Sequence, residues 1–159
     1  MTAAPPHPDC GTCRANRGEL AAPGGVVYED ALWRAEHAIE PIPMVGWLVL
    51  KPLRHVEAFA DLTPEEAAAF GPIAHRLTRA MTAVLGAVKV YVCLFAEAEH
   101  FTHIHVHLIP RLADAAPERR GPRVFEYLRE ANAHGNRGDV AEAARAADAI
   151  RTTLASSSA

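Results

Sequence analysis

The sequence predicts a domain that combines antiparallel strands with helices, and two stretches carry this prediction. In the run from His103 to Arg111, three histidines alternate with aliphatic residues, which is the period of a β-strand. In Thr63–Glu66, a threonine N-cap, a proline at the first helical position and a capping-box glutamate mark the start of a helix. The two signals together indicate a mixed architecture.

Length, composition and charge limit the class of protein. The 159 residues, 50% of them hydrophobic, predict one domain with a sizeable core. A net charge of -3 argues against a dedicated nucleic-acid-binding protein, and no apolar run is long enough to span a membrane. Residues 1–9 lack the basic and apolar regions of a signal peptide. We therefore expect a cytoplasmic protein whose partners are neither nucleic acids nor membranes.

The first half of the predicted domain is an antiparallel meander followed by a helix. Short apolar or alternating segments, separated by Gly and Pro, predict strands over 26–28, 31–39 and 46–50. From the N-cap at Thr63, apolar residues recur every three or four positions to about Leu85, and a glycine follows. This spacing predicts one long amphipathic helix.

The second half begins with a predicted hairpin. Strand patterns over 88–95 and 101–109 are joined by a short polar loop. After a charged loop, a helix is expected over 124–133, and Asp139 is expected to cap a last helix that runs through Leu154. Because this last helix is rich in alanine, we expect it to pack at an edge or an interface.

These elements divide the chain into four parts. We expect a flexible tail over 1–9, the main domain over 10–111, a C-terminal helical extension over 112–155 and a disordered tail over 156–159. No internal repeat and no second domain are indicated.

The alternating run suggests chemistry on phosphorus. His103, His105 and His107 would share one face of a strand, close enough to converge on one phosphate group. A neutral imidazole can attack a phosphoryl group if its other N–H has an acceptor, such as a backbone carbonyl. The middle residue, His105, is best placed as the nucleophile, and His107 can donate to the phosphate or the leaving group. The alternative is a set of exposed strand residues without a catalytic role.

A second candidate site is the pair Cys10 and Cys13, which are separated by two residues. Two thiolates at this spacing suit a metal or a redox role, and structural zinc needs two further Cys or His ligands. A redox pair is disfavoured because no βαβ pattern follows. A pair of exposed thiols remains the alternative, whereas Cys93 lies within an apolar strand and is expected in the core.

Three segments together carry a resemblance to a known family. The run from His103 to Arg111 resembles the signature of the histidine triad (HIT) superfamily of nucleotide hydrolases and transferases. The segment Gly46–His55 is similar to the Gly-His-x-Leu-Val-x-Pro-x-x-His segment of that family. Cys10-x-x-Cys13, with the Gly-Glu that follows, is similar to the start of its zinc-bearing members.

The resemblance implies an α+β fold with a five-stranded antiparallel sheet and two main helices, to which the C-terminal helices would be added. It also implies a homodimer in which the two sheets join, and a nucleotide pocket at the triad. His105 would take the nucleotidyl group as a covalent intermediate, and His107 would contact the phosphate. Four residues would hold a structural zinc ion: Cys10, Cys13, His55 and His103.

The sequence departs from the family pattern in two places that concern the substrate. Ala98–Thr102 replaces a Gly-Gln-Ser/Thr run, so His100 would act as donor or acid to the leaving group, with Glu99 near a substrate phosphate. The acid that usually holds the ribose hydroxyls would fall on Ile39, and Glu40 could take its place. Each of these side chains could instead be solvated surface.

Three further side chains have two interpretations each. Arg111 is a candidate substrate-phosphate contact, although solvated surface is the more common role of such a residue. Trp33 and Trp47 could stack on a nucleobase, but a tryptophan within an apolar strand is more often part of the core.

The expected activity is that of a HIT-type enzyme. It would hydrolyse or transfer a nucleoside monophosphate from a dinucleoside polyphosphate, a phosphoramidate or an adenylylated compound. The alternative is a zinc-braced module that binds a nucleotide with little or no turnover. A metal-handling or redox-sensing protein is a third hypothesis, which the placement of histidines on a strand disfavours.

Overall fold

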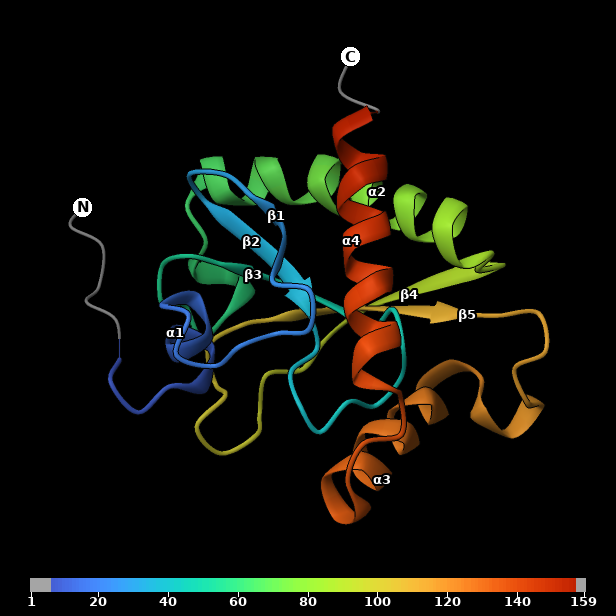
Figure 1. Cartoon of the computed structure of the whole chain (residues 1–159). Helices are drawn as coiled ribbons and strands as arrows, with labels where there is room; N and C mark the ends of the chain where they lie inside the picture. The colour runs from blue at the N-terminus through green and yellow to red at the C-terminus, as the bar shows by residue number, and fades with distance from the viewer. Residues whose placement is uncertain (1–6, 157–159) are drawn as a thin grey trace.

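The computed structural model describes residues 7–156; the remaining parts of the two expected tails lie outside the described residues. Five strands form one antiparallel sheet, as predicted, in the order β1-β2-β3-β5-β4 (Figure 1). The strands are β1 (Val26–Glu29), β2 (Trp33–His37), β3 (Leu48–Pro52), β4 (Lys89–Leu94) and β5 (Val106–Arg111). The meander of the first three strands and the pairing of the last two are confirmed.

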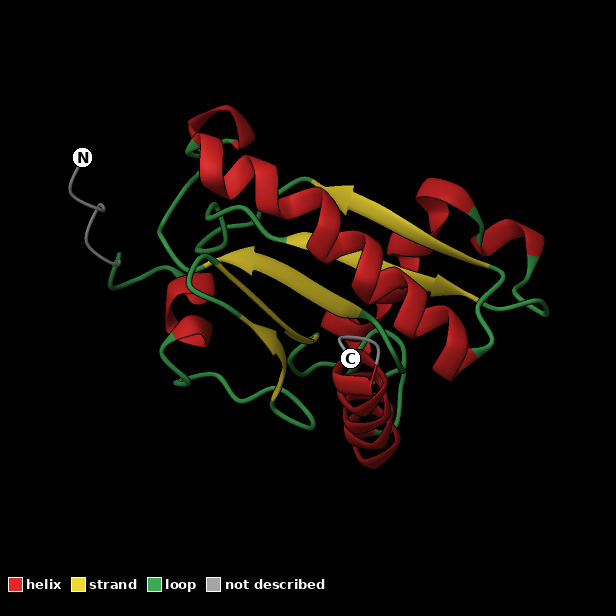
Figure 2. Cartoon of the chain, turned by 90° about the horizontal axis from the view of Figure 1, so that it is seen from above, coloured by secondary structure: helices red, strands yellow, loops and turns green. Residues whose placement is uncertain are grey.

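The helix α2 (Pro64–Leu85) connects β3 to β4 across one face of the sheet (Figure 2). Its predicted start is confirmed, because Thr63 Oγ1 accepts from the Glu66 N–H and the Glu66 carboxylate accepts from the Thr63 N–H. Gly86 ends the helix in the left-handed conformation, with a φ of 65°. Leu77 and Met81 are fully buried against the sheet.

The strand predicted over 101–109 begins later in the structure than the sequence indicated. Pairing with the neighbouring strands starts only at Val106, so His103 and His105 lie in a segment that precedes β5. The physical reason is that the Ile104 N–H donates to the carbonyl of Val56, a loop residue, at 2.7 Å and is not free to join the sheet. Ile104 and Val106 nevertheless enter the interior together, as the alternation predicts.

The helices other than α2 are short except for the last. They are α1 (Gly11–Asn16), α3 (Glu126–His134) and α4 (Val140–Ser156), with short 3-10 helices at Phe59–Asp61, Pro117–Arg119 and Gly121–Phe125. Asp139 Oδ1 accepts from the Glu142 N–H at 2.8 Å, so the predicted cap of α4 is confirmed. No helix within residues 7–156 is long and apolar enough to cross a membrane.

The last helix packs at an edge of the sheet, as expected, and it also adds to the core. α4 lies against α2 and the edge strand β1 (Figures 1 and 2), and Ile150 and Leu154 belong to the same hydrophobic core as the sheet. α4 also approaches the loop before β1 closely at Gly24, where a Cβ would lie only 2.8 Å from the Ala147 Cβ. Arg151 also donates to the carbonyls of Gly24 and Val26 at 2.8 and 2.7 Å. The C-terminal helix is therefore part of the domain core.

Candidate active site and metal centre

A cavity of about 530 Å³ lies on the face of the sheet opposite α2. Because strand side chains alternate, Leu48 and Leu50 of β3 enter the core while Val49 and Lys51 line the cavity. The other walls come from β2, the triad segment, the loop after β4, α1 and α3. This volume suits a ligand of nucleotide size.

His105 lines the cavity with one ring nitrogen already bound to the backbone. Its Nδ1–H donates to the carbonyl of His103 at 2.9 Å, so Nε2 carries the lone pair. Burial lowers the pKa of His105, and the positive charge of Lys51 acts in the same direction. The ring is therefore neutral at pH 7, and among the described residues no hydrogen bond engages its Nε2.

His107, two residues further on, lines the same cavity and is 8% exposed. The indole Nε1–H of Trp47 donates to its Nδ1 at 3.0 Å. Its ring meets those of Trp47, His105 and Phe125 edge to face, with centroids 5.6, 5.0 and 5.3 Å away. Burial, followed by the nearby His105, lowers the pKa of His107 to about 3. This imidazole is also neutral.

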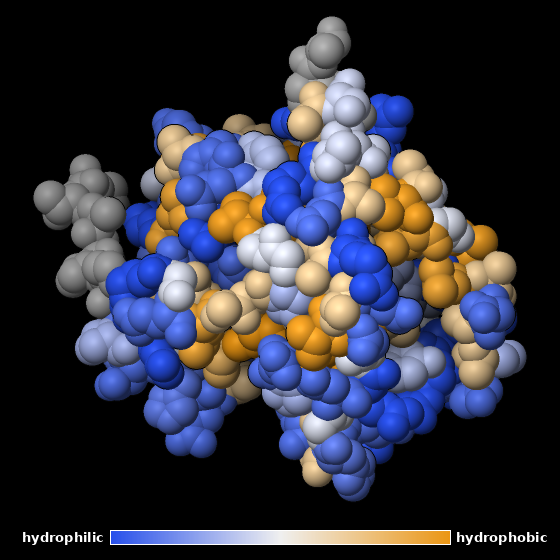
Figure 3. Space-filling model, viewed as in Figure 1, coloured by the Kyte–Doolittle hydropathy of each residue, from blue (hydrophilic) through white to orange (hydrophobic). Residues whose placement is uncertain are grey.

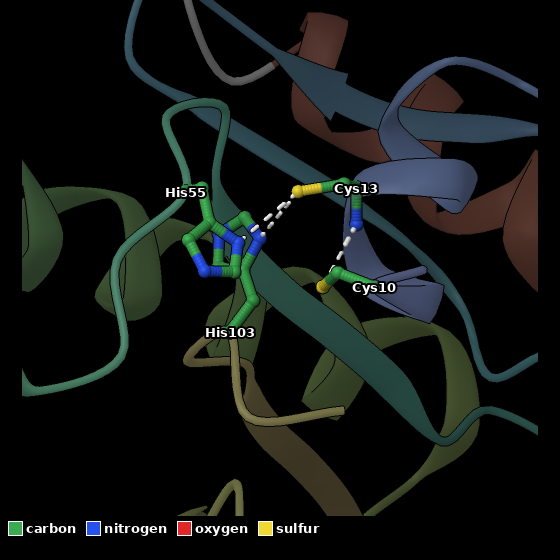
Figure 4. Close-up of side chains that lie close together, drawn as sticks. All are labelled: Cys10, Cys13, His55 and His103. Atoms are coloured by element: carbon green, nitrogen blue, oxygen red, sulfur yellow. Dashed lines mark hydrogen bonds between the residues drawn. The ribbon is translucent and has the colours of Figure 1, made fainter. Parts of the chain in front are cut away.

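His103 faces away from the cavity into a cluster with Cys10, Cys13 and His55 (Figure 4). One ligand atom from each of the four lies within 4.8 Å of the others. The Cys13 Sγ is 3.2 Å from the His55 Nδ1 and 3.5 Å from the His103 Nδ1. Such separations are those of neighbouring ligands around a tetrahedral zinc ion, whose bonds to sulfur and nitrogen are about 2.3 and 2.0 Å.

Local structure explains how these four donors meet. Cys10 is the N-cap of α1, and its Sγ accepts from the Cys13 N–H, so one helical turn holds both sulfur atoms together. The outer nitrogen of His55 lies 3.3 Å from the Glu57 carboxylate, which also accepts from the Thr102 hydroxyl at 2.7 Å. A carboxylate behind a ligating histidine is the usual support of such sites. The donor set therefore fits a closed, structural zinc site.

A profile of the HIT domain matches residues 19–114, more than half of the chain. The chain belongs to the HIT family. The HIT family is one of nucleotide-binding hydrolases and transferases, and this is the general class of the chain. No curated protein matches the sequence.

Solved structures share the fold of this HIT domain. A zinc-bound histidine triad family protein from Mycobacterium smegmatis is 24% identical, with a TM-score of 0.65 over 94% of this chain and 95% of that one. A hypothetical histidine triad nucleotide-binding protein from Sulfolobus tokodaii is 18% identical, with a TM-score of 0.69 over 92% and 93%. A uridylyltransferase is 18% identical, with a TM-score of 0.64; the match covers 94% of this chain but 46% of that one.

The structure brings only some of the expected substrate residues of the HIT domain to the cavity. Glu40 lines it, and its carboxylate accepts from the side-chain amide of Asn136 at 3.0 Å. Glu99 and His100 do not line it; their side chains are 92% and 64% exposed and face each other at 3.7 Å. His100 also has a positive φ of 64°, at the tip of the loop. In this conformation neither side chain is placed to contact a molecule bound in the cavity.

Arg111 is also separated from the cavity. It ends β5, pairs with Lys89 across the sheet and lines a different hollow beside Tyr91. Extended chain separates it from His105 by about 20 Å, at roughly 3.3 Å per residue. The structure therefore does not support a contact between Arg111 and a phosphate held at His105.

Burial of Trp33 and Trp47 is the core role that the sequence favoured. Two other features left no signal in the sequence, and the first is the contact between Trp47 and His107. Trp47, which stands where the family pattern has a histidine, is fully buried beside His107, and Trp33 is fully buried with its Nε1–H on the Glu66 carbonyl at 3.0 Å. Neither indole is available to stack on a nucleobase. The second feature is a buried ionic cluster, in which the Glu36 carboxylate pairs with Lys51 and, at 3.1 Å, with Arg34.

Proposed function

We propose that the chain is a nucleotide hydrolase or nucleotidyltransferase that works through a covalent nucleotidyl-His105 intermediate. The observation that carries this proposal is the hydrogen bond from His105 Nδ1–H to the His103 carbonyl. It leaves the lone pair on Nε2 in a ring that lines a nucleotide-sized cavity. Membership of the HIT family supports the same class of reaction.

The proposed reaction has two displacements at phosphorus. The His105 Nε2 lone pair attacks the phosphorus of a nucleoside monophosphate unit, and the bond to the leaving group breaks with its electron pair. Water or another acceptor then attacks the same phosphorus and gives up its proton to the solvent, while the phosphorus–nitrogen bond breaks and its electron pair returns to Nε2. His107 donates a hydrogen bond to the phosphate oxygens or the leaving group, and Glu40 is the candidate contact for the ribose hydroxyls.

We further propose that Cys10, Cys13, His55 and His103 hold a structural zinc ion. Four protein donors would fill the tetrahedral coordination and leave no position for substrate, so the metal would brace the fold and take no part in the displacement. The similarity in fold to a zinc-bound HIT protein supports this assignment.

A homodimer joined through β4 is the third part of the proposal. β4 is an edge strand; Val92 on it and Val88 just before it are 48% and 53% exposed. Apolar surface is visible on the side of the molecule where β4 lies (right in Figure 3). An unpaired edge with exposed valines is suited to pairing with a second copy, which would extend the antiparallel sheet.

The test is turnover of a labelled dinucleoside polyphosphate by the wild type, by His105→Ala and by His75→Ala. His75 is an exposed histidine on α2, remote from the cavity, and serves as the matched control. We expect activity, and a labelled covalent adduct after denaturation, in the wild type and His75→Ala only. Adduct formation or turnover in His105→Ala would contradict the role of His105.

The alternative is a zinc-braced module that binds a nucleotide with little or no turnover. The exposed position of His100, which leaves the expected acid away from the cavity, is the observation that favours it. Nucleotide binding measured by calorimetry, without turnover of any substrate offered, would select this alternative.

A further inference from the structure

The hydrogen bond between Trp47 and His107 restricts what His107 can do. Both side chains are buried, and the indole Nε1 is 3.0 Å from the imidazole Nδ1. An indole nitrogen is a donor only, so the Nδ1 of His107 has to be the acceptor. The single proton of the neutral ring is then on Nε2, the nitrogen that Trp47 leaves free.

The same contact opposes protonation of His107. An imidazolium carries N–H groups on both nitrogens, and its Nδ1–H would point at the indole N–H of Trp47. Protonation would therefore break a buried hydrogen bond and leave two buried donors facing each other. No other tautomer or charge state of His107 satisfies the Trp47 N–H.

We propose that Trp47 is a positioning residue that holds His107 as a neutral Nε2–H donor, and that this site is thereby suited to leaving groups that depart as anions. This inference rests on the proposed function, because it concerns the leaving group of the displacement at His105. Phosphoanhydrides are therefore the expected substrate class, and phosphoramidates are expected to react more slowly.

The chemical reason for this preference is whether the leaving group has to gain a proton. A neutral imidazole can donate a hydrogen bond to a departing oxygen, but full transfer of its proton would leave an imidazolate. A phosphate leaving group departs as an anion and needs only the hydrogen bond. An amine leaving group has to gain a proton as the phosphorus–nitrogen bond breaks, and His107 cannot supply it.

The other titratable groups of the cavity wall do not readily replace it. His37 is neutral, because its Nδ1–H donates to the Ala38 carbonyl and its Nε2 accepts from the Gly46 N–H, both at 2.9 Å. Lys51 is held in the ion pair with Glu36. Glu40 and Glu97 also line the cavity, and the Glu40 carboxylate accepts from the side-chain amide of Asn136 at 3.0 Å.

The first test reads the tautomer directly and does not depend on activity. Protonated and unprotonated ring nitrogens of histidine have well-separated nitrogen NMR shifts, and His107→Asn assigns the signals of His107. We expect an Nε2–H tautomer in the wild type and in Trp33→Phe. Trp33 is an equally buried tryptophan with its own indole hydrogen bond, so it controls for lost volume. In Trp47→Phe we expect a mixture of tautomers. An Nδ1–H tautomer in the wild type would overturn the proposal.

The second test compares leaving groups. The ratio of kcat/KM for a dinucleoside polyphosphate to that for the matching nucleoside phosphoramidate should exceed one in the wild type and in Trp33→Phe. In Trp47→Phe we expect the anhydride value to fall about tenfold, which corresponds to the loss of one hydrogen bond, and the ratio to fall with it. An unchanged ratio in Trp47→Phe, or a wild type that prefers the phosphoramidate, would overturn the leaving-group inference. Absence of turnover on both substrates would overturn the proposed function and this preference together, while the NMR result still decides the tautomer.

Discussion

Lys51 on β3 and Glu36 on β2 form an ion pair that is almost completely withdrawn from solvent, with each side chain 4% exposed. Burial lowers the pKa of Lys51, and the Glu36 carboxylate opposes that effect. A buried pair of this kind gains little net stability over a hydrophobic pair, but losing one partner leaves an uncompensated charge. Arg34, which also contacts Glu36, compensates only part of it.

Lys51→Met should therefore destabilise the fold by roughly 3 kcal/mol in urea unfolding, because Glu36 loses its buried cation. The matched control is the double variant Glu36→Leu with Lys51→Met, which removes both charges and should lie within about 1 kcal/mol of the wild type. If Lys51→Met is as stable as the double variant, then leaving the Glu36 carboxylate without Lys51 does not destabilise the fold.

The stability of the fold should depend on the neutral state of His107. Its folded pKa of about 3 lies below the usual 6.5, so the unfolded chain binds more protons between these values. The free energy of unfolding should then fall as the pH drops below about 6.5, with His107 alone contributing about 2 kcal/mol of loss by pH 5. Urea titrations at several pH values check this.

His107→Gln serves as the control for the pH dependence. It removes the titrating ring but keeps the same Cys and His cluster, so the difference between the two proteins isolates His107. We expect a shallower loss of stability in the variant. Parallel curves for the two proteins would show that His107 does not titrate in this way.

Removal of a proposed zinc ligand should release the metal. In Cys13→Ala we expect the zinc content per chain, measured by atomic absorption, to fall to near zero, with a lower melting temperature. Cys93→Ala is the control, because Cys93 is the third free cysteine and lies on β4 away from the cluster. Equal zinc content in the two variants would refute the proposed ligand set.

A charge placed on the edge strand should prevent the proposed dimer. Val92→Glu puts like charges opposite each other where two β4 strands would pair, so sedimentation velocity should give a monomer where the wild type gives a dimer. Val140 on α4 is also exposed, at 38%, and Val140→Glu should leave the association unchanged. A monomeric wild type would contradict the dimer.

The features that the sequence predicted best are those that depend on residues close together along the chain. The N-cap at Thr63, the end of α2 at Gly86 and the Asp139 cap all follow from short local patterns, and all are observed. The histidine run was predicted as a strand from its alternation alone. The hydrogen bond from the Ile104 N–H to Val56, which keeps the start of the run out of the sheet, joins segments far apart in the chain and left no local signal.

The sequence predicted those residues of the candidate site that belong to a motif. It did not predict the contacts that arise from the register between strands. Val49 lies opposite His107 on one side and opposite Glu36 on the other, and this register places the ionic cluster in the cavity wall. The Trp47–His107 contact likewise joins residues far apart in the chain. One sequence does not specify which strands are neighbours, so neither contact could be derived before the sheet order was known.

The Arg151 side chain on α4 donates hydrogen bonds to the carbonyls of Gly24 and Val26, so the last helix is held against the start of β1. The segment matched to the HIT family stops at residue 114, well before this helix. A chain shortened to the matched segment would lose α4 and uncover the apolar side of α2 and β1. We therefore expect a chain that ends at residue 114 to be less stable than one that reaches Leu154, because a truncation that removes the C-terminal helix also removes part of the core.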